Sequence, residues 1–448
     1  MKFFRLIVLI ISLCVYSPLK NTFNSINNQS IENLNYFLLK SEQNIIIDDP
    51  SKGDFHTEVQ YNYITNPNPE SIKNYANGRI DNSRPKGNIL DFSKDVSNSD
   101  SYVIQYSSTN DFEKEKTITI KDLKEKKYIL KNLKLSEIIY YRGAINEEGL
   151  LNSNIHKLTV TSLPPRNLDI PGVSNSRDIG GYKTYLVKNG IIKQGLYFRT
   201  GRVKGIKEEG KKIVKELGIK REINLRGTDE HAEIDGVSYY YIPMKNTNKN
   251  NRFDGYNEEF IKIFDLFSEA DKYPIMLHCH AGADRTGVSS FALLALLGVE
   301  KNDLAKDYAF TSFSIYGPRY LGGDSQFDSW INKLNNFGGN TLAEKVKSWL
   351  MSKGIKESVL EHIREIFIDG YGKKEKKEEK EEREKKEEKK YLNIPDEFYD
   401  LSWNEKSKII KQLFSKKNTT LNYYYPKNNL INHISLKNLI EKYLSKNY

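Results

Sequence analysis

The chain contains very little cysteine and lacks long apolar runs after its first residues. Among its 448 residues there are two cysteines, Cys14 and Cys279, and Cys14 lies in the N-terminal apolar run. If that run is removed, one cysteine remains, and an intramolecular disulfide is excluded. No run after Tyr16 is long enough to cross a bilayer, and no internal repeat is visible.

The chain also lacks a strong excess of one charge. Its 69 Lys and Arg stand against 59 Asp and Glu, for a formal net charge of +10. This balance does not produce the concentrated basic face of a nucleic-acid-binding protein, so we expect no nucleic-acid partner. A mildly basic surface suits phosphorylated or otherwise anionic substrates, or an anionic surface.

The first residues have the pattern of a targeting segment. Lys2 and Arg5 precede the apolar run Leu6–Ile11, which is typical of a secretory signal. The following Ser17–Lys20 lacks a small-residue cleavage site, so an uncleaved anchor stays open as an alternative. We expect residues 1–20 to be a signal peptide or short anchor, and the protein to be secreted or attached to the cell envelope.

Composition divides the rest of the chain into five parts. Residues 21–44 are polar and predict a linker, and residues 45–163 predict an all-β sandwich. Its β-branched and aromatic runs fall at residues 102–106, 117–120, 128–130, 138–144 and 158–160. Their order resembles a fibronectin type III module, which implies a role in spacing or in binding an envelope or host-surface partner.

After Pro164-Pro165, helical and strand patterns alternate. Residues 166–372 therefore predict an α/β domain with a mostly parallel sheet flanked by helices. Residues 373–390 contain only Lys, Arg and Glu, which predicts a charged linker or a solvated helix. Two amphipathic stretches in residues 391–448 predict a small helical module.

The most informative stretch is one loop with its two flanks. It reads His278-Cys279-His280-Ala281-Gly282-Ala283-Asp284-Arg285-Thr286-Gly287. The residues before it predict a short buried strand, and those after it predict an apolar helix that ends at Gly298. A loop between a strand end and a helix N-terminus directs backbone N–H groups and the positive end of the helix dipole at one place, which predicts an anion site.

The residue types in this loop suit phosphate chemistry. A lone cysteine at a strand end is most often a small buried hydrophobe, but here the positive field favours a thiolate nucleophile at Cys279. Arg285, six positions later, matches two oxygens of a phosphate, and Thr286 is placed to donate to the departing thiolate. The residues expected to bind the phosphate with Arg285 are His280, Ala281, Gly282 and Ala283. The loop thus predicts cleavage of a phosphate ester through a phosphocysteine intermediate.

Five blocks, in order along the chain, extend this pattern. They are Asn175–Tyr182, Gly195–Gly201, Leu217–Glu230, the Cys279 loop and Asp307-Tyr308. Together they resemble the bacterial tyrosine-protein phosphatase family, whose loop reads His-Cys-x-Ala-Gly-Lys-Asp-Arg-Thr-Gly. The resemblance extends over residues 168–367, and it implies a Cys-x5-Arg phosphatase fold without a cofactor or metal.

The resemblance also implies roles for single residues. Cys279 resembles the family nucleophile and Arg285 its phosphate clamp. Asp284 resembles the aspartate that protonates the leaving oxygen and then activates water; the alternative is a structural role, such as capping the helix after the loop. His278 resembles the histidine that shapes the loop and tunes the thiolate; the alternative is a histidine that is only packed.

Two departures from the family pattern bear on the activity. The family lysine before the loop aspartate is Ala283 here, which weakens the case for the phosphoinositide activity of some relatives. The family Asp-Leu-Arg block begins with Asn224, so an acid role at that position is lost and Asp284 gains weight. For the three arginines outside the loop, structural ion pairs are favoured over substrate contacts; they are Arg177, Arg199 and Arg226.

The leading hypothesis is a metal-independent protein-tyrosine phosphatase, with phosphoserine and phosphothreonine as further substrates of a dual-specificity enzyme. One alternative is a phosphatase of phosphoinositides or inositol phosphates, so the expected partner is a phosphorylated protein or phospholipid. The other is a protein that binds a phosphorylated ligand without turnover, which the complete set of loop residues disfavours.

Overall fold

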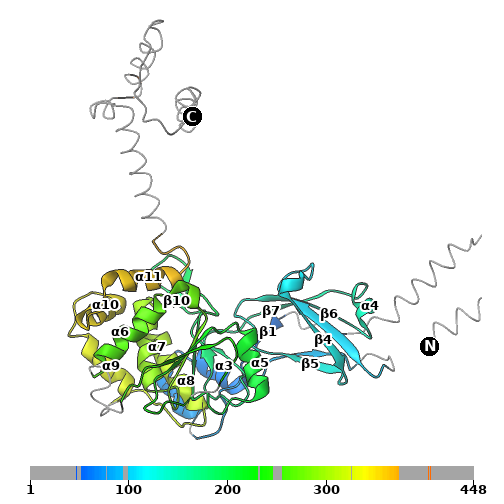
Figure 1. Cartoon of the computed structure of the whole chain (residues 1–448), viewed down its shortest axis with the longest axis horizontal. Helices are drawn as coiled ribbons and strands as arrows, with labels where there is room; N and C mark the ends of the chain where they lie inside the picture. Colours follow the sequence, from blue (N-terminus) through cyan, green and yellow to red (C-terminus); the bar gives the residue numbers. More distant parts are fainter. Residues whose placement is uncertain are drawn as a thin grey trace, which may run out of the picture. The chain divides into compact units, whose positions relative to one another are not determined.

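The computed structural model describes residue 47, residues 52–372 apart from 77, 94–98, 231–232, 246–254 and 324, and residues 402 and 404. The chain divides into two compact units, Met1–Lys373 and Lys374–Tyr448, and the elements described below lie in the first (Figure 1). The expectations for residues 1–20, 21–44 and 373–390 lie outside the described residues, as does nearly all of 391–448. Among the described residues, no helix combines the length and the apolar character needed to span a bilayer.

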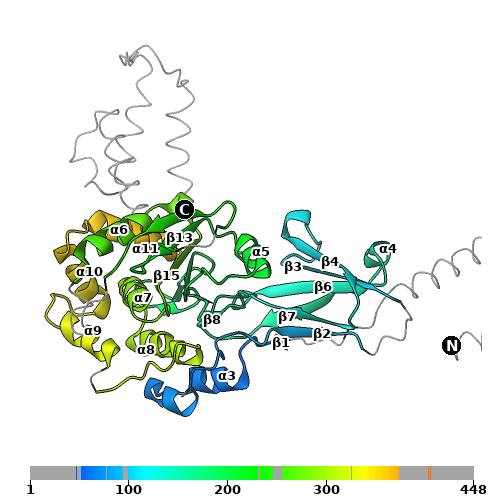
Figure 2. The ribbon, with the colours of Figure 1, turned by 60° about the horizontal axis from the view of Figure 1, so that its bottom comes forward.

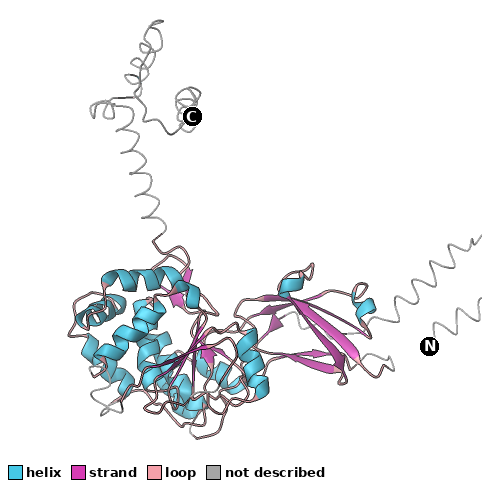
Figure 3. Cartoon of the chain, viewed as in Figure 1, coloured by secondary structure: helices cyan, strands magenta, loops and turns pink. Residues whose placement is uncertain are grey.

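The β-rich region forms two sheets, drawn in magenta in Figure 3. The larger has the strand order β1-β7-β6-β3-β4, and the smaller pairs β2 with β5. Their bounds are β1 Lys52–Gly53, β2 Asn88–Asp91, β3 Tyr102–Ser107, β4 Thr117–Leu123, β5 Lys127–Leu130, β6 Ile138–Ala144 and β7 His156–Val160, with a short α4 at Glu147–Leu150 and η3 at Lys114–Lys116. Leu90 of β2, Leu130 of β5 and Ile104 of β3 belong to one buried cluster, so the two sheets share a core. Each strand expected from the sequence is present, and the likeness to a fibronectin module stays a prediction.

The start of this region was predicted wrongly as strand. It contains α3 (Glu58–Thr65) and the 3-10 helix η2 (Pro69–Asn74). Local chemistry explains both, because Thr57 and Gln60 form a reciprocal capping box for α3, and Asn68 caps η2 ahead of Pro69. These helices pack on α8 (Lys301–Phe310) of the α/β part and not in the β-sandwich core (Figure 2).

The α/β part is built on a six-stranded sheet with the order β14-β13-β15-β12-β9-β8. The bounds are β8 Arg166–Asn167, β9 Arg177–Asp178, β12 Tyr197–Thr200, β13 Arg221–Asn224, β14 Ser238–Tyr241 and β15 Ile275–His278; β10 (Lys183–Thr184) and β11 (Gly190–Ile191) form a separate pair. The pairs β14–β13, β13–β15 and β15–β12 are parallel, whereas β12–β9 and β9–β8 are antiparallel. The mostly parallel sheet expected from the sequence is confirmed.

The two faces of this sheet have separate cores because side chains alternate along each strand. Ile275 and Leu277 of β15 face one core and Met276 faces the other. The helices that pack on the first face are α6 Asn257–Phe267, α7 Arg285–Leu296, α8, α9 Gln326–Leu334, α10 Leu342–Ser352 and α11 Glu357–Phe367. On the second face lies α5 (Glu208–Glu216), through Val214. Helix α7 is buried from Thr286 to Leu296, which makes it the central helix of the domain.

Candidate active site

Cys279 lies directly after β15, the strand between β13 and β12 in the sheet. Since all three strands are parallel, their carboxyl ends meet at one edge, which is where sheets of this kind place their ligand sites. The chain then loops to α7, which begins at Arg285. The strand, loop and helix expected from the sequence are therefore present in that order.

A cavity of about 510 Å³ opens beside this loop. Residues from four separate segments line it: Arg79, Arg226, Gly227, Thr228, Cys279, His280, Ala281, Asp284, Arg285, Tyr316 and Arg319. Cys279 is 2% exposed, so the cavity reaches a sulfur that is otherwise shielded from solvent. Of the sequence-predicted site residues, His278, Gly282, Ala283 and Thr286 do not line this cavity.

The backbone of the loop is held by three hydrogen bonds on its outer side. The carbonyl oxygen of His280 accepts from the Arg202 N–H at 3.0 Å. That of Ala281 accepts from Asn175 Nδ2 at 2.9 Å, and that of Gly282 accepts from Arg199 Nη2 at 2.8 Å. None of the three donors lines the cavity.

These bonds determine where the loop N–H groups point. In a trans peptide the C=O and the following N–H point in opposite directions, so the N–H groups of Ala281, Gly282 and Ala283 face away from the three donors. Among the described residues none of these N–H groups has a hydrogen-bond partner. Successive unpaired N–H groups before a helix N-terminus form an anion-binding concavity.

Gly282 is required at its position by conformation and by space. Its φ is +67°, and a Cβ there would lie 2.3 Å from the carbonyl oxygen of Thr200. The loop therefore contacts the end of β12 backbone to backbone. This contact explains why Gly282 lies behind the cavity wall and not on its surface.

Behind the loop lies a buried cluster of charges. Asp307 on α8 accepts from Arg177 Nε at 2.8 Å and also pairs with Arg199. Burial opposes the ionisation of Asp307, but the two guanidinium groups outweigh it and hold its pKa below the ordinary value. The structural ion pairs predicted for Arg177 and Arg199 are present, and Arg199 also reaches Gly282, so the cluster fixes the loop from behind.

Arg285 is the first residue of α7, and two backbone carbonyl oxygens hold its side chain. Its Nη1 donates to Leu225 at 3.2 Å and to Met244 at 3.3 Å. Arg285 is half-buried and lines the cavity, and no carboxylate among the described residues pairs with it. Such a group keeps donors for a bound phosphate.

Asp284 precedes α7, but it does not cap that helix. Its side chain makes no hydrogen bond to the first turn; it pairs with Arg319, with Oδ1 3.2 Å from Nε and Oδ2 3.3 Å from Nη2. The capping alternative is therefore wrong. The carboxylate lines the cavity, where a proton donor for a leaving group is needed.

His278 and Thr286 lie beneath the cavity. His278 is fully buried, and its Nε2 lies 2.9 Å from Glu222 Oε1 on β13. Its Nδ1 lies 3.3 Å from the carbonyl oxygen of Cys279, so the side chain supports the loop from the sheet side. Thr286 Oγ1 is buried and has no hydrogen-bond partner among the described residues, and its donation to the departing thiolate stays a prediction.

His280 lies on the solvent side of the loop. Its ring is 5.5 Å from that of Tyr316, edge to face. Burial lowers its pKa, and the nearby Arg226, Arg202 and Arg285 lower it further. These effects favour the neutral imidazole of His280, which lines the cavity.

Arg226 is both ion-paired and part of the cavity wall. Its Nη1 lies 2.7 Å from Glu230 Oε2, as the structural-pair prediction required. Asn224, at the position of the family aspartate, accepts from the Arg226 N–H and donates to the carbonyl oxygens of Thr228 and Glu230. Its amide shapes this loop and does not line the cavity.

Five wall residues were not singled out from the sequence: Arg79, Gly227, Thr228, Tyr316 and Arg319. Tyr316 and Arg319 lie just after the 3-10 helix η6 (Thr311–Phe313), in a polar stretch without a motif. Arg79 lies some two hundred positions before the loop, in a segment assigned to another domain. Among the described residues, no group of three or more His, Cys, Asp or Glu is placed to hold a metal ion.

A central parallel strand, a Cys-x5-Arg loop and the helix that follows it define a Cys-x5-Arg phosphatase domain. The model of the tyrosine phosphatase family matches residues 168–393. The chain belongs to that family.

Individual relatives are distant. A tyrosine-protein phosphatase of Nostoc commune is 25% identical over 146 residues, covering 27% of this chain and 50% of that protein. The chain thus spans half the length of this curated relative.

Two solved structures have folds that overlap with part of the chain. TpbA of P. aeruginosa is 13% identical, with a TM-score of 0.26, and the match covers 36% of this chain and 87% of that one. The core catalytic domain of the PP-IP phosphatase SIW14 of S. cerevisiae, in complex with citrate, is 15% identical, with a TM-score of 0.23 and coverages of 32% and 92%. TM-scores this low do not support a transfer of function.

Proposed function

We propose that this protein is a phosphatase that hydrolyses phosphate monoesters of proteins, with phosphotyrosine as its principal substrate and phosphoserine and phosphothreonine as further ones. The observation that carries the proposal is the cavity that Cys279, Arg285 and Asp284 line together. Membership of the tyrosine phosphatase family supports the same activity.

The proposed reaction has two steps. In the first, the Cys279 thiolate attacks phosphorus, the S–P bond forms, and the bond to the ester oxygen breaks. Asp284 donates its proton to that oxygen, while Arg285 and the loop N–H groups hold the other phosphate oxygens. In the second, Asp284 takes a proton from water, the water oxygen attacks phosphorus, and the S–P bond breaks to release phosphate and the thiolate.

The proton step requires the Asp284–Arg319 pair to open. In the structure both carboxylate oxygens of Asp284 accept from Arg319, so a proton on either oxygen would face a guanidinium N–H while the pair is closed. A substrate whose charge competes for Arg319 would free Asp284 to carry a proton. The leaving oxygen then lies beside the only described carboxyl group on the cavity wall.

Aromatic side chains on the wall favour an aryl ester. Tyr316 and His280 both line the cavity, with their rings in edge-to-face contact. A phosphotyrosine ring gains from such neighbours beyond the area that it buries. An alkyl phosphate gains less, which ranks phosphoserine and phosphothreonine second.

A second candidate is a phosphatase of inositol phosphates or phosphoinositides. The observation in its favour is that Arg79, Arg226 and Arg319 line the cavity in addition to Arg285. These arginines supply positive charge that the loop lacks at Ala283, a residue that is fully buried here. A panel that compares inositol lipids with phosphotyrosine peptides separates the two candidates.

The test of the proposed function uses the full chain. We expect hydrolysis of p-nitrophenyl phosphate and of phosphotyrosine peptides in the presence of a chelator. Cys279→Ser should abolish turnover, and mass spectrometry of the acid-quenched wild-type reaction should find a phosphoryl group on the Cys279 peptide. A variant on the exposed face of α5, Lys212→Ala, is the matched control and should retain full activity.

Two outcomes would contradict the proposal. Turnover that survives Cys279→Ser would exclude a cysteine nucleophile. Tight binding of phosphopeptides by a folded wild-type chain that hydrolyses none of them would show a binding protein, which is the remaining alternative.

We propose in addition that the protein acts outside the cytoplasm, from the charged and apolar pattern of residues 1–20. Fractionation of cells that express the full chain, compared with a chain lacking residues 1–20, tests this. Equal amounts of both in the cytoplasm would contradict it. In the same fractionation, a chain without the β-rich region tests whether that region binds an envelope partner.

A further inference from the structure

The cavity wall includes a residue from the segment that precedes β2. Arg79 follows η2, whereas every other wall residue lies after the β-rich region. The segment from His56 to Arg84 therefore belongs to the catalytic domain in function, although the β-rich strands separate it from the rest in sequence.

Apolar packing holds this segment on α8 and η6. Tyr63, Ile64 and Ile72 form one buried cluster with Phe310 and Phe313. Burial of side chains of this size stabilises the docked position by about 2 kcal/mol each. The packed part of the segment is therefore held firmly on α8 and η6, and Arg79 follows it.

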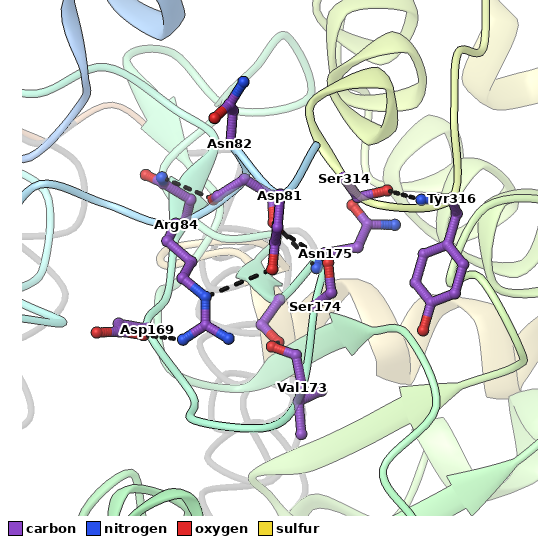
Figure 4. A network of polar contacts seen from close by, with 12 residues as sticks. Asp81, Asn82, Arg84, Asp169, Val173, Ser174, Asn175, Ser314 and Tyr316 are labelled. Atoms are coloured by element: carbon purple, nitrogen blue, oxygen red, sulfur yellow. Dashed lines mark hydrogen bonds and ion pairs between the residues drawn. The ribbon is translucent and has the colours of Figure 1, made fainter. Parts of the chain in front are cut away.

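Polar contacts fix the end of the segment beside the loop supports (Figure 4). Asp81 Oδ1 accepts from Ser174 Oγ at 3.0 Å and from Ser83 Oγ at 2.6 Å, and the Asn82 N–H donates to the Phe313 carbonyl oxygen at 2.7 Å. Arg84 pairs with Asp81 and, at 2.5 Å, with Asp169. Asp81 and Asn82 are thus anchored to the α/β part, and Arg79 precedes them by only a few residues.

The same contacts lead to the phosphate loop. Ser83 Oγ accepts from the Asn175 N–H at 3.1 Å, and Asn175 Nδ2 donates to the Ala281 carbonyl oxygen at 2.9 Å. Two side chains thus connect the segment that carries Arg79 with the loop that carries Cys279. The position of Arg79 relative to the phosphate site is set by the fold.

Arg79 differs from the other arginines of the wall in its partners. Arg226 pairs with Glu230, Arg319 pairs with Asp284, and Arg285 is held by carbonyl oxygens. No described residue forms an ion pair or a hydrogen bond with Arg79, which is exposed. Its side chain lies against Gly317, where a Cβ would approach its Nε to 3.3 Å.

We propose that Arg79 is a specificity-determining residue that binds a second anionic group of the substrate, next to the phosphate that is cleaved. The inference rests on the proposed function, since it assumes that the phosphate occupies the Cys279 loop. A guanidinium at the mouth of the cavity presents its donors as a planar fork that matches a carboxylate or a phosphate. When the substrate lacks the second anionic group, the Arg79 guanidinium stays hydrated and adds nothing to binding.

The test compares pairs of ligands that differ only in the second anion. One pair is a phosphotyrosine peptide with a single glutamate next to the phosphotyrosine and the same peptide with glutamine at that position. The other pair is an inositol bisphosphate and the matching monophosphate. The first pair reports an acidic side chain as the second anion, and the second pair reports a second phosphate.

For Arg79→Ala we expect KM to rise about five-fold for the doubly anionic member of at least one pair, with kcat unchanged. KM for the singly anionic member should change less than two-fold, and the difference should shrink in high salt. Arg79→Lys should retain part of the preference. Lys73→Ala, an exposed cation of the same segment outside the cavity, is the control and should behave as wild type.

Dissociation constants measured for the same ligands in the Cys279→Ser background separate this inference from the proposed function. If the wild type hydrolyses nothing but Arg79→Ala still weakens binding of the doubly anionic ligand selectively, the proposed reaction fails and the binding role stands. If Arg79→Ala affects both members of each pair equally, or neither, the role assigned to Arg79 is wrong.

Discussion

Asp284 and Arg319 form a two-point ion pair on the cavity wall, with N–O distances of 3.2 and 3.3 Å. Asp284 is the residue just before α7, and Arg319 lies in the connection between η6 and α9. A carboxylate in this position, if it served only the helix, would bond to the first-turn N–H groups, which it does not. The pair instead holds Asp284 on the cavity wall, which Arg319 also lines.

Asp284→Asn should separate good from poor leaving groups. An amide cannot deliver a proton, so we expect kcat for an alkyl phosphate to fall at least a hundred-fold. For p-nitrophenyl phosphate, whose leaving oxygen needs no proton, the first step should change less than ten-fold. Single-turnover kinetics on both substrates measure this, and equal losses on the two would assign Asp284 a structural role.

Asp307→Asn should destabilise the catalytic domain. The substitution leaves the guanidinium groups of Arg177 and Arg199 buried without a counter-charge, a change that typically lowers the free energy of unfolding by about 3–5 kcal/mol. Trp330 and Trp349 are buried in the main core, so urea unfolding followed by tryptophan fluorescence reports on it. Asp235→Asn removes an exposed partner of Lys215 and is the control, with an expected change below about 0.5 kcal/mol.

The loss of stability in Asp307→Asn should depend on pH in a definite direction. The pKa of Asp307 is lower in the folded state than the ordinary value. Its contribution is therefore fully present above about pH 4 and is lost as pH falls through the folded-state pKa. The wild type and Asp307→Asn should approach each other in stability only in strong acid, and a gap that closes near neutral pH would contradict this account.

His56 should make the stability of the segment from His56 to Arg84 sensitive to mild acid. Its ring is fully buried, with Nε2 2.7 Å from the Leu163 carbonyl oxygen, and Nδ1 has no hydrogen-bond partner among the described residues. Burial lowers its pKa, although Leu163 and Asp54 act in the opposite direction. Protonation would place an unpaired N–H in this buried site.

Because the folded-state pKa of His56 lies below its ordinary value, the stability it contributes is fully present above about pH 6.5. It is lost as pH falls from there toward the folded-state pKa. Melting temperatures of the wild type and His56→Gln, measured from pH 8 to pH 5, should therefore diverge in slope below pH 6.5. His362→Gln, on the exposed side of α11, is the control, and parallel curves for the wild type and His56→Gln would refute the assignment.

Much of the fold is readable from the sequence because it depends on local pattern. The strands of the β-rich region and the order of helices and strands around Cys279 follow from side-chain periodicity. The segment of α3 and η2 was misassigned because its cap residues, Thr57 and Asn68, were overlooked beside the strand patterns that follow. Short strands such as β8 and β9 have two residues each and give no periodic signal.

The candidate site likewise contains residues that the sequence places together and residues that only the fold brings in. Cys279, Arg285 and Asp284 share one loop, and their spacing alone places them together. His278 was expected to shape the loop and tune the thiolate; its side chain lies beneath the loop, near Glu222 and the Cys279 carbonyl oxygen, and an effect on the thiolate stays a prediction. Arg79 and Arg319 carry no motif, and a lone arginine in a polar stretch is indistinguishable from a solvated one.

The sequence by itself determined the chemistry of the loop, since a strand end, a glycine with positive φ and a helix start all lie within ten consecutive residues. The tertiary structure alone decided which charges surround that loop. Asp307 meets Arg177 and Arg199, and Arg79 reaches the cavity mouth, because helix and sheet packing bring together segments more than a hundred residues apart. Contacts of that kind arise from the burial of apolar faces elsewhere in the domain, and no short stretch of residues encodes them.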